Sequence, residues 1–156
     1  MQHLWRIGID TPDYVSDDLS GEGAKHSGGR WNRPGTAVVY TSTSIALACL
    51  ETLVHRRSSS LPMNRYLVRI DVPDALWDAR EQLASPGVGW DAEPVGRVSL
   101  DAGEGWARRL SSAILAVPSA IVPEEFNVLI NPAHPDAGAV SAVKVRKWLY
   151  DLRLLG

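Results

Sequence analysis

The sequence contains a single cysteine, has almost balanced charge and lacks long apolar runs, and each shortage excludes a class of protein. Cys49 has no second cysteine to pair with, which excludes an intramolecular disulfide and favours a reducing compartment, with Cys49 as a small core residue. The formal net charge of -2 argues against nucleic acid as a direct partner. No apolar segment approaches the roughly 20 residues of a membrane span, and the first residues do not form a secretory signal. We therefore expect a cytoplasmic protein without a membrane partner.

Several common cofactor and metal motifs are also missing. No Gly-x-Gly-x-x-Gly follows an expected strand and no Walker-type loop is present, so a Rossmann fold and a P-loop are not supported. The four histidines lack the spacing of a zinc protease and, with one cysteine, indicate no metal site. No Gly-x-Ser-x-Gly surrounds Ser119, so an acyl-transfer serine is not indicated. We predict neither a metal nor a bound cofactor.

The length and the apolar content suit one domain with its own core. The chain has 156 residues, of which 45% are hydrophobic, and we expect residues 1–156 to fold as one domain. Strands are predicted at 36–42, 66–72, 113–122 (as an edge strand or two pieces, because of Pro118), 127–130 and 140–145. Helices are predicted at 44–57 and 105–112, with one or two helical turns in 75–83, and residues 16–35 are predicted to be a loop. Strands and helices do not alternate strictly, which indicates an α+β fold: a mixed or antiparallel sheet core with flanking helices.

Glu51 lies in the most apolar predicted helix. Helical spacing places it on one stripe with Ala48 and His55. Either this stripe faces water and Glu51 pairs with His55 or Arg56, or Glu51 lies at a cleft, where it accepts hydrogen bonds from a sugar hydroxyl or activates a nucleophile. The predicted buried face of the same helix consists of Ala46, Leu50, Leu53 and Val54.

The segment Gly28-Gly29-Arg30-Trp31-Asn32 combines a flexible backbone with an arginine. Paired glycines let a backbone approach a ligand, and the planar guanidinium of Arg30 suits phosphate oxygens. On its own, the segment is better explained as an ordinary turn. Trp31 is either a buried anchor for this loop or a ligand contact.

Tyr40 and Ser119 also have two interpretations each. Tyr40 shares a strand face with Val38 and Ser42, so it is either a core aromatic or a ring that stacks on a flat ligand. Ser119 follows Pro118 at a break in an apolar segment, which favours a turn residue when it is considered alone.

In combination and in this order, these residues resemble the RES domain family, which is named for an arginine, a glutamate and a serine. The matching positions are Arg30 in Gly-Gly-Arg-Trp-Asn, Glu51 in Cys-Leu-Glu-Thr-Leu-Val-His and Ser119 in Val-Pro-Ser-Ala-Ile-Val-Pro. Residues 4–6, 39–42 and 126–132 match as well, whereas 66–110 are hard to place and 148–154 only approximate the family's usual end. The resemblance covers essentially the whole chain.

The resemblance implies an ADP-ribosyltransferase-like fold and NAD as the substrate. Glu51 would bond a ribose hydroxyl, Arg30 would grip the pyrophosphate, Tyr40 would stack near the nicotinamide and Ser119 would bond the ribose or nicotinamide side. These four residues are the predicted catalytic set, and the predicted substrate-binding residues are Arg30, Trp31, Tyr40 and Asn127. A carboxylate near the ribose fits this chemistry, since cleavage of the nicotinamide–ribose bond builds positive charge on the sugar.

The family further implies a toxin of a bacterial toxin-antitoxin pair, with a helical Xre-type antitoxin that covers the cleft around Arg30. Nucleic acid would then be reached only through the antitoxin, and a homodimer stays open. The acceptor also stays open. We favour net NAD depletion by a glycohydrolase or phosphorylase, with a mono-ADP-ribosyltransferase acting on a host protein as the first alternative. The second alternative is a non-catalytic partner-binding module in which Arg30, Glu51 and Ser119 form internal salt bridges and turns.

Overall fold

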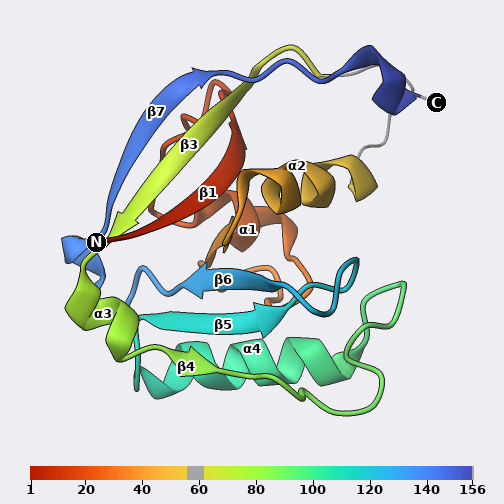
Figure 1. Ribbon diagram of the computed structural model, residues 1–156. Coiled ribbons are helices and arrows are strands. Elements are labelled where there is room, and N and C mark those ends of the chain that lie inside the picture. The colour runs from red at the N-terminus through yellow and green to blue at the C-terminus, as the bar shows by residue number, and fades with distance from the viewer. Residues whose placement is uncertain (56–61, 156) are drawn as a thin grey trace.

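The fold is built on a sheet that runs through the whole molecule. The structure is a computed structural model that describes residues 1–55 and 62–155. Within these residues seven strands form one sheet in the order β4-β5-β6-β2-β1-β3-β7 (Figure 1). The strands are β1 (Gln2–Ile9), β2 (Val39–Ser42), β3 (Arg65–Val72), β4 (Glu81–Gln82), β5 (Ile114–Pro118), β6 (Phe126–Ile130) and β7 (Ser141–Lys147). The helices are α1 (Glu22–Ser27), α2 (Ile45–Val54), α3 (Asp74–Asp78) and α4 (Arg97–Arg109), with 3-10 turns η1 (Ala137–Ala139) and η2 (Leu152–Leu155).

Strand direction makes the sheet mixed. β4 runs parallel to β5, and the other neighbouring pairs are antiparallel. The predicted α+β class, with a mixed sheet and flanking helices, is therefore confirmed. No helix in the described ranges is both long and apolar enough to cross a bilayer.

The sheet separates into two parts between β1 and β2. β1 pairs with β3 along its whole length, from Gln2 opposite Val72 to Ile9 opposite Arg65, whereas the register of β1 with β2 consists of Trp5 opposite Ser42. In Figure 1, β1, β3 and β7 run steeply while β5 and β6 run across the view. We refer to β1, β3 and β7 as the β1 half and to β2, β4, β5 and β6 as the β2 half.

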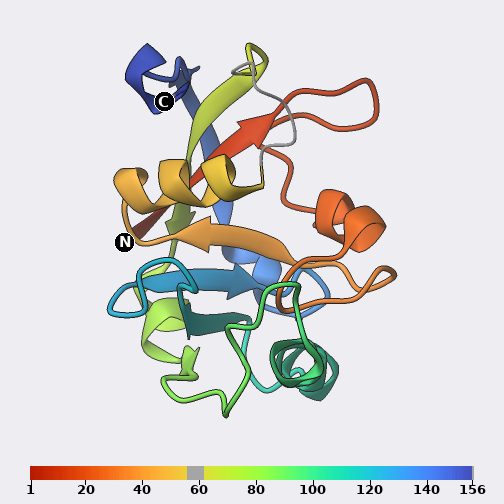
Figure 2. The ribbon, with the colours of Figure 1, turned by 90° about the vertical axis from the view of Figure 1, so that its right-hand side faces the viewer.

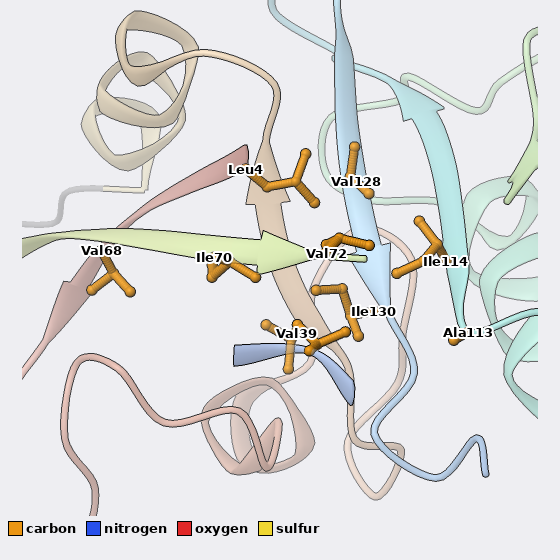
Figure 3. Packing of buried hydrophobic residues seen from close by; sticks show 10 residues of the cluster. Leu4, Val39, Val68, Ile70, Val72, Ala113, Ile114, Val128 and Ile130 are labelled. Carbon is orange, nitrogen blue, oxygen red and sulfur yellow. The ribbon is translucent and has the colours of Figure 1, made fainter. Parts of the chain in front are cut away.

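The main core lies between the two halves. Valine, isoleucine and leucine side chains from both halves pack together, and their branched shapes suit the pleated surface (Figure 3). They include Leu4, Val68, Ile70 and Val72 from the β1 half and Val39, Ile114, Val128 and Ile130 from the β2 half. This packing fixes the line along which β1 and β2 diverge.

Two helices cover the outer faces of the two halves. α4 packs through Trp106 on the β2 half, together with Trp31, Leu115 and Leu129. α2 packs through Ala48 on Ile7 and Leu67 of the β1 half. Figure 2 shows α1, in orange-red, beside the loop that follows β1. The helices therefore lie where their apolar residues meet strands, and α2 brings Glu51 within hydrogen-bond distance of Asn127 on β6.

Three expectations about helices need correction. Residues 16–35 contain α1, and α4 begins at Arg97 rather than near residue 105. Leu110 lies outside the helix in the left-handed region, with φ 55°. The first part of α4 is polar and contains Gly103, so its helicity depends on packing against Trp31 more than on local propensity.

The predicted start of α2 is confirmed, and its predicted buried face is wrong at Ala46 and Val54, whereas Leu50 and Leu53 are partly buried and Leu53 packs against the core. Ser44 caps the helix by accepting a hydrogen bond from the backbone N–H of Leu47. Ala46 is exposed and Val54 is 57% exposed, while Leu47 and Ala48 are buried. The helix turns this side inward because Ile7 of β1 offers an apolar surface there. The helix ends at Val54, and the predicted continuation to Arg57 and the stop at 58–60 lie outside the described residues.

The predicted strand 113–122 is shorter than expected. β5 ends at Pro118, which has no N–H to continue the ladder. β5 is not an edge strand, because it lies between β4 and β6. Ser119 therefore follows directly after an interior strand, and this position brings it to the site described next.

Candidate active site

Glu51 lies at the centre of a small polar cluster on the inner side of α2. Its Oε1 accepts a hydrogen bond from the hydroxyl of Ser119 at 2.7 Å and a second from the side-chain amide of Asn127 at 2.7 Å. Ser119 follows β5 and Asn127 lies on β6, so residues far apart in the sequence meet here. Three predicted site residues are thus brought together, and the alternative in which Glu51 simply faces water does not describe this structure. Its alternative partner Arg56 lies outside the described residues.

Ser119 is held so that its hydroxyl proton points to Glu51. The side chain is fully buried, and its Oγ accepts from the backbone N–H groups of Ile121 and Val122, both at 3.1 Å. With these two donors directed at the oxygen, the serine proton is the group left to donate, and it goes to Glu51. Ser119 is therefore both a turn residue, as its local sequence suggests, and a contact of the carboxylate.

Asn127 is oriented by a residue that the sequence did not reveal as part of the site. The Ser42 hydroxyl donates to Asn127 Oδ1 at 2.7 Å, which directs the amide NH₂ group toward Glu51. Ser42 lies directly opposite Asn127 in the pairing of β2 with β6. The signal that could have identified it is its position two residues after Tyr40, on the same strand face.

The two side-chain donors to Glu51 meet the same carboxylate oxygen. Both side-chain donors meet Oε1, and within residues 1–55 and 62–155 no protein donor meets Oε2 of Glu51. A carboxylate whose orientation is fixed by the protein can accept a hydrogen bond from a ligand hydroxyl or stabilise positive charge that develops nearby. The same described ranges contain no group of three or more histidine, cysteine, aspartate or glutamate side chains placed to hold a metal ion.

Tyr40 fastens the loop that contains Arg30 and Trp31. Its hydroxyl accepts from the backbone N–H of Trp31 at 3.0 Å and donates to Asn32 Oδ1 at 2.6 Å. Burial raises the pKa of the Tyr40 hydroxyl well above its ordinary value. Gly29 permits this contact, because a Cβ at that position would lie 2.7 Å from the tyrosine oxygen. The hydroxyl of Tyr40 therefore fixes the position of the loop at Trp31 and Asn32.

Trp31 is the buried anchor of this loop. Its side chain is 2% exposed and stacks on Trp90, with ring centroids 6.1 Å apart and planes at 22°. Its backbone carbonyl lies against Gly103 of α4, where an added Cβ would be 1.8 Å from the oxygen. Of the two alternatives for Trp31, the structure shows the anchor, since almost none of the ring is left for a ligand.

Arg30 is engaged by a neighbouring loop. Its Nη1 donates to the carbonyls of Trp90 at 3.1 Å and Ala92 at 3.0 Å, and its Nη2 donates to Glu93 at 3.2 Å. The side chain is 16% exposed. In the described part of the chain, no hydrogen bond joins Arg30 to the Glu51 cluster. The structure therefore places Arg30 as the tie between residues 28–33 and 90–93, and its pyrophosphate role stays a prediction.

Comparisons with known proteins identify the class to which this fold and site belong. The chain matches the RES domain over residues 3–153, and it belongs to this family. The resemblance based on Arg30, Glu51 and Ser119 is thereby confirmed, and the divided α+β sheet agrees with the expected ADP-ribosyltransferase-like fold.

The relatives of this chain are named as toxins. A protein of Sphingobium sp. (strain YBL2), named Prs ADP-ribosylating toxin, is 60% identical over 97% of this chain and 96% of its own length. Proteins named Toxin Res from Pseudomonas putida and Yersinia enterocolitica are 37% and 36% identical, over 97% and 90% of this chain and 98% and 93% of their own lengths. The family is therefore one of toxins, and one similar member is named for ADP-ribosylation.

Proposed function

We propose that this protein is a toxin that cleaves the nicotinamide–ribose bond of NAD and transfers the ADP-ribosyl group to a protein, with Glu51 as the catalytic carboxylate. The observation that carries the proposal is the Glu51 cluster: two neutral side chains donate to Oε1 at 2.7 Å each, and no donor in the described residues meets Oε2. Family membership and the name of the Sphingobium relative support the choice of NAD.

The chemistry requires a negative group beside the sugar. As the bond to nicotinamide breaks, its electron pair leaves with nicotinamide and the ribose gains positive charge. A nucleophile of the acceptor then forms a bond to the same ribose carbon and loses its proton. Glu51 would stabilise the positive charge and bond a ribose hydroxyl through Oε2, and it needs no reorientation because Ser119 and Asn127 already hold it.

The acceptor is the point on which the proposal departs from net NAD depletion. The relative that is 60% identical over nearly the whole length is named for the ADP-ribosylation of Prs. We therefore propose the host's Prs as the acceptor and treat water and phosphate as competing acceptors. A fixed carboxylate would assist each of these reactions equally in the cleavage step, so the products must be measured to separate them.

In this proposal Arg30 and Tyr40 act indirectly, by holding the loop of residues 28–33 in place. Tyr40 fixes the backbone at Trp31, and Arg30 ties the loop to residues 90–93. For Arg30 to grip a pyrophosphate directly, its guanidinium would have to exchange the two carbonyls for phosphate oxygens. An Xre-type antitoxin that covers this region would silence the toxin, and a complex that releases nicotinamide as fast as the free protein would contradict that partnership.

The test follows both products of the reaction. Purified protein is incubated with NAD, with and without Prs, while nicotinamide is quantified and the intact mass of Prs is recorded. We expect nicotinamide release together with a Prs mass increase of one ADP-ribosyl group. Release without any Prs modification would support the glycohydrolase or phosphorylase alternative, which added phosphate then separates. No release under any condition would support the non-catalytic module.

A further inference from the structure

β7 is the last strand of the sheet, and in residues 1–55 and 62–155 no strand pairs with its outer side. Figure 1 shows β7, in blue, at the outer margin of the β1 half. Six of its seven residues are exposed. An edge strand presents backbone N–H and C=O groups without partners, so it can pair with another extended chain. β7 is therefore a place where this sheet can accept one more strand.

The pairing of β7 with β3 contains an irregularity that limits the length of such a strand. The register shifts between Leu67 and Val68, which lie opposite Arg146 and Lys144, so Val145 has no partner on β3. An extra residue of this kind bends the strand and interrupts the ladder. The regular part of the edge is therefore short, and it suits a short extended segment better than a long strand.

The end of the chain that contains β7 is basic, although the chain as a whole is acidic. Residues 141–156 contain four basic side chains and one acidic one, whereas residues 1–140 contain twelve basic and seventeen acidic ones. Arg146 and Lys147 of β7 are exposed, and among the described residues neither forms a salt bridge. A local excess of positive charge attracts a partner of opposite charge and repels a basic one.

The two cations at the end of β7 differ from Lys144, which already has an acidic partner. Lys144 Nζ lies 3.1 Å from Asp10 Oδ2, and this pair leaves little of its charge for a further contact. The guanidinium of Arg146 lies 4.8 Å from the centre of the Trp148 ring, which holds the charge beside the edge. Arg146 is therefore positioned to receive a carboxylate.

Apolar side chains accompany these charges. Val143 is 41% exposed and Val145 is 46% exposed, and Leu149, shortly after the strand, is 62% exposed. Cross-strand contact with such side chains stabilises an added strand. A nucleic acid has no backbone that continues a β-ladder and offers little to exposed valines. The combination of a free edge, valines and basic groups therefore favours a polypeptide over a nucleic acid.

A second copy of the chain fits this edge poorly. Two antiparallel β7 strands centred on Val145 would place Lys144 of each copy opposite Arg146 of the other, and like charges directly opposite each other are destabilising. Lysine on an edge strand is also a common means by which sheets avoid pairing with themselves. The same charges that repel a copy of this chain attract an acidic segment.

We propose that the edge of β7 binds a short, extended, acidic segment of a partner protein, which adds to the sheet as a further strand. Carboxylates of the segment would pair with Arg146 and Lys147, and its apolar side chains would contact Val143 and Val145. The backbone would supply hydrogen bonds, and the charges would supply the preference for an acidic sequence. This inference does not depend on the reaction proposed for Glu51.

The test measures the binding of defined peptides to the full chain by fluorescence anisotropy. The probe is a labelled peptide of alternating glutamate and valine, about eight residues long, which matches the length of a short strand. It is compared with a lysine–valine peptide, with the same glutamate–valine peptide carrying N-methyl groups at alternate backbone nitrogens, and with a short DNA duplex. Hydrogen exchange of residues 141–147 locates the contact.

Charge reversal on β7 provides the matched variants. Arg146→Glu and Lys147→Glu are compared with Arg108→Glu, a control at an exposed arginine of α4. We expect the glutamate–valine peptide to bind wild type and the control equally, and each β7 variant more weakly by roughly tenfold. Amide exchange in β7 should slow when the peptide is bound. Thermal melting verifies that the variants are folded, and Lys147→Glu decides the matter if Arg146→Glu does not fold.

Each alternative occupant of the edge has its own result. No binding of the glutamate–valine peptide up to about 1 mM would mean that the lysines and arginine only protect the edge, and it would overturn the proposal. Equal binding of the N-methylated peptide would overturn strand addition. Tighter binding of DNA would assign the surface to a nucleic acid. A dimer whose β7 amides are protected without peptide would assign it to a second copy.

Discussion

Glu51 and Arg30 belong to the same family signature, yet they lie in hydrogen-bond networks of different kinds. Side-chain donors hold one oxygen of Glu51, and no donor in residues 1–55 and 62–155 meets the other. Arg30 donates to two backbone carbonyls and one carboxylate of a neighbouring loop. The two residues therefore differ in what surrounds them: Glu51 is held by side chains from two neighbouring strands, whereas Arg30 ties its own loop to residues 90–93. Four substitutions sharpen this contrast.

The largest expected effect is on the packing of the loop at Trp31 against α4. Gly103→Ala would place a Cβ 1.8 Å from the backbone carbonyl of Trp31, and both groups belong to well-packed elements. We expect a loss in the free energy of unfolding at or above the upper end of the usual range of about 1–3 kcal/mol for overpacking. Urea unfolding measures it, with Gly138→Ala, where an added Cβ meets nothing within 4 Å, as the control. An unchanged midpoint would show that the loop does not need α4.

Arg30→Lys tests whether Arg30 is architectural. A lysine ammonium cannot reproduce the planar fork that reaches Trp90, Ala92 and Glu93, so the free energy of unfolding should fall by about 2 kcal/mol. The control is Arg153→Lys, whose side chain is 91% exposed. If Arg30→Lys instead keeps full stability and loses NAD turnover, Arg30 grips the pyrophosphate as the resemblance implied.

Ser119→Ala tests the other network. It removes one donor to Glu51 and leaves the N–H groups of Ile121 and Val122 without their acceptor. We expect a loss of about 1–2 kcal/mol in stability and roughly a tenfold fall in nicotinamide release, because Glu51 is then less firmly oriented. Release is compared with that of Ser27→Ala, on exposed α1. Full activity in Ser119→Ala would mean that Asn127 alone suffices to orient the carboxylate.

The smallest effect concerns Tyr40 at high pH. Burial raises the pKa of the Tyr40 hydroxyl, so above the unfolded-state pKa of about 10 the unfolded chain ionises while the folded chain keeps its proton. The contribution of the Tyr40 hydroxyl to the free energy of unfolding is complete below pH 10 and decreases as the pH rises further. Urea unfolding between pH 7 and 11 should show this decrease, and Tyr40→Phe should reduce it. Equal slopes in both proteins would contradict the buried, bonded hydroxyl.

Much of the fold could be predicted from local sequence, because β-branched runs specify strands and a serine specifies the start of α2. The missed segments depend on tertiary contacts. α4 begins early because Glu104 accepts from the Arg33 N–H and the Thr36 hydroxyl and because Gly103 receives Trp31, and neither contact has a local signal. The buried face of α2 is likewise decided by β1, beneath it, rather than by its own periodicity.

The candidate site also contains residues that the sequence indicated and residues whose roles depend on tertiary contacts. Glu51 and Ser119 were identified through family resemblance, since no spacing rule predicts contacts between residues 68 and 76 positions apart. The role of Ser42 required the register of β2 on β6, and the carbonyl partners of Arg30 required the path of the 90–93 loop.

The most direct test of the account compares activity with stability in Glu51→Gln. Nicotinamide release from NAD and the free energy of unfolding are measured on the same preparations of wild type, Glu51→Gln and Glu124→Gln, the last at an exposed glutamate. We predict that Glu51→Gln stays folded, with a stability within about 1 kcal/mol of wild type, and loses roughly 10²–10³-fold in release, while Glu124→Gln keeps both. A folded Glu51→Gln that releases nicotinamide at the wild-type rate would contradict the account.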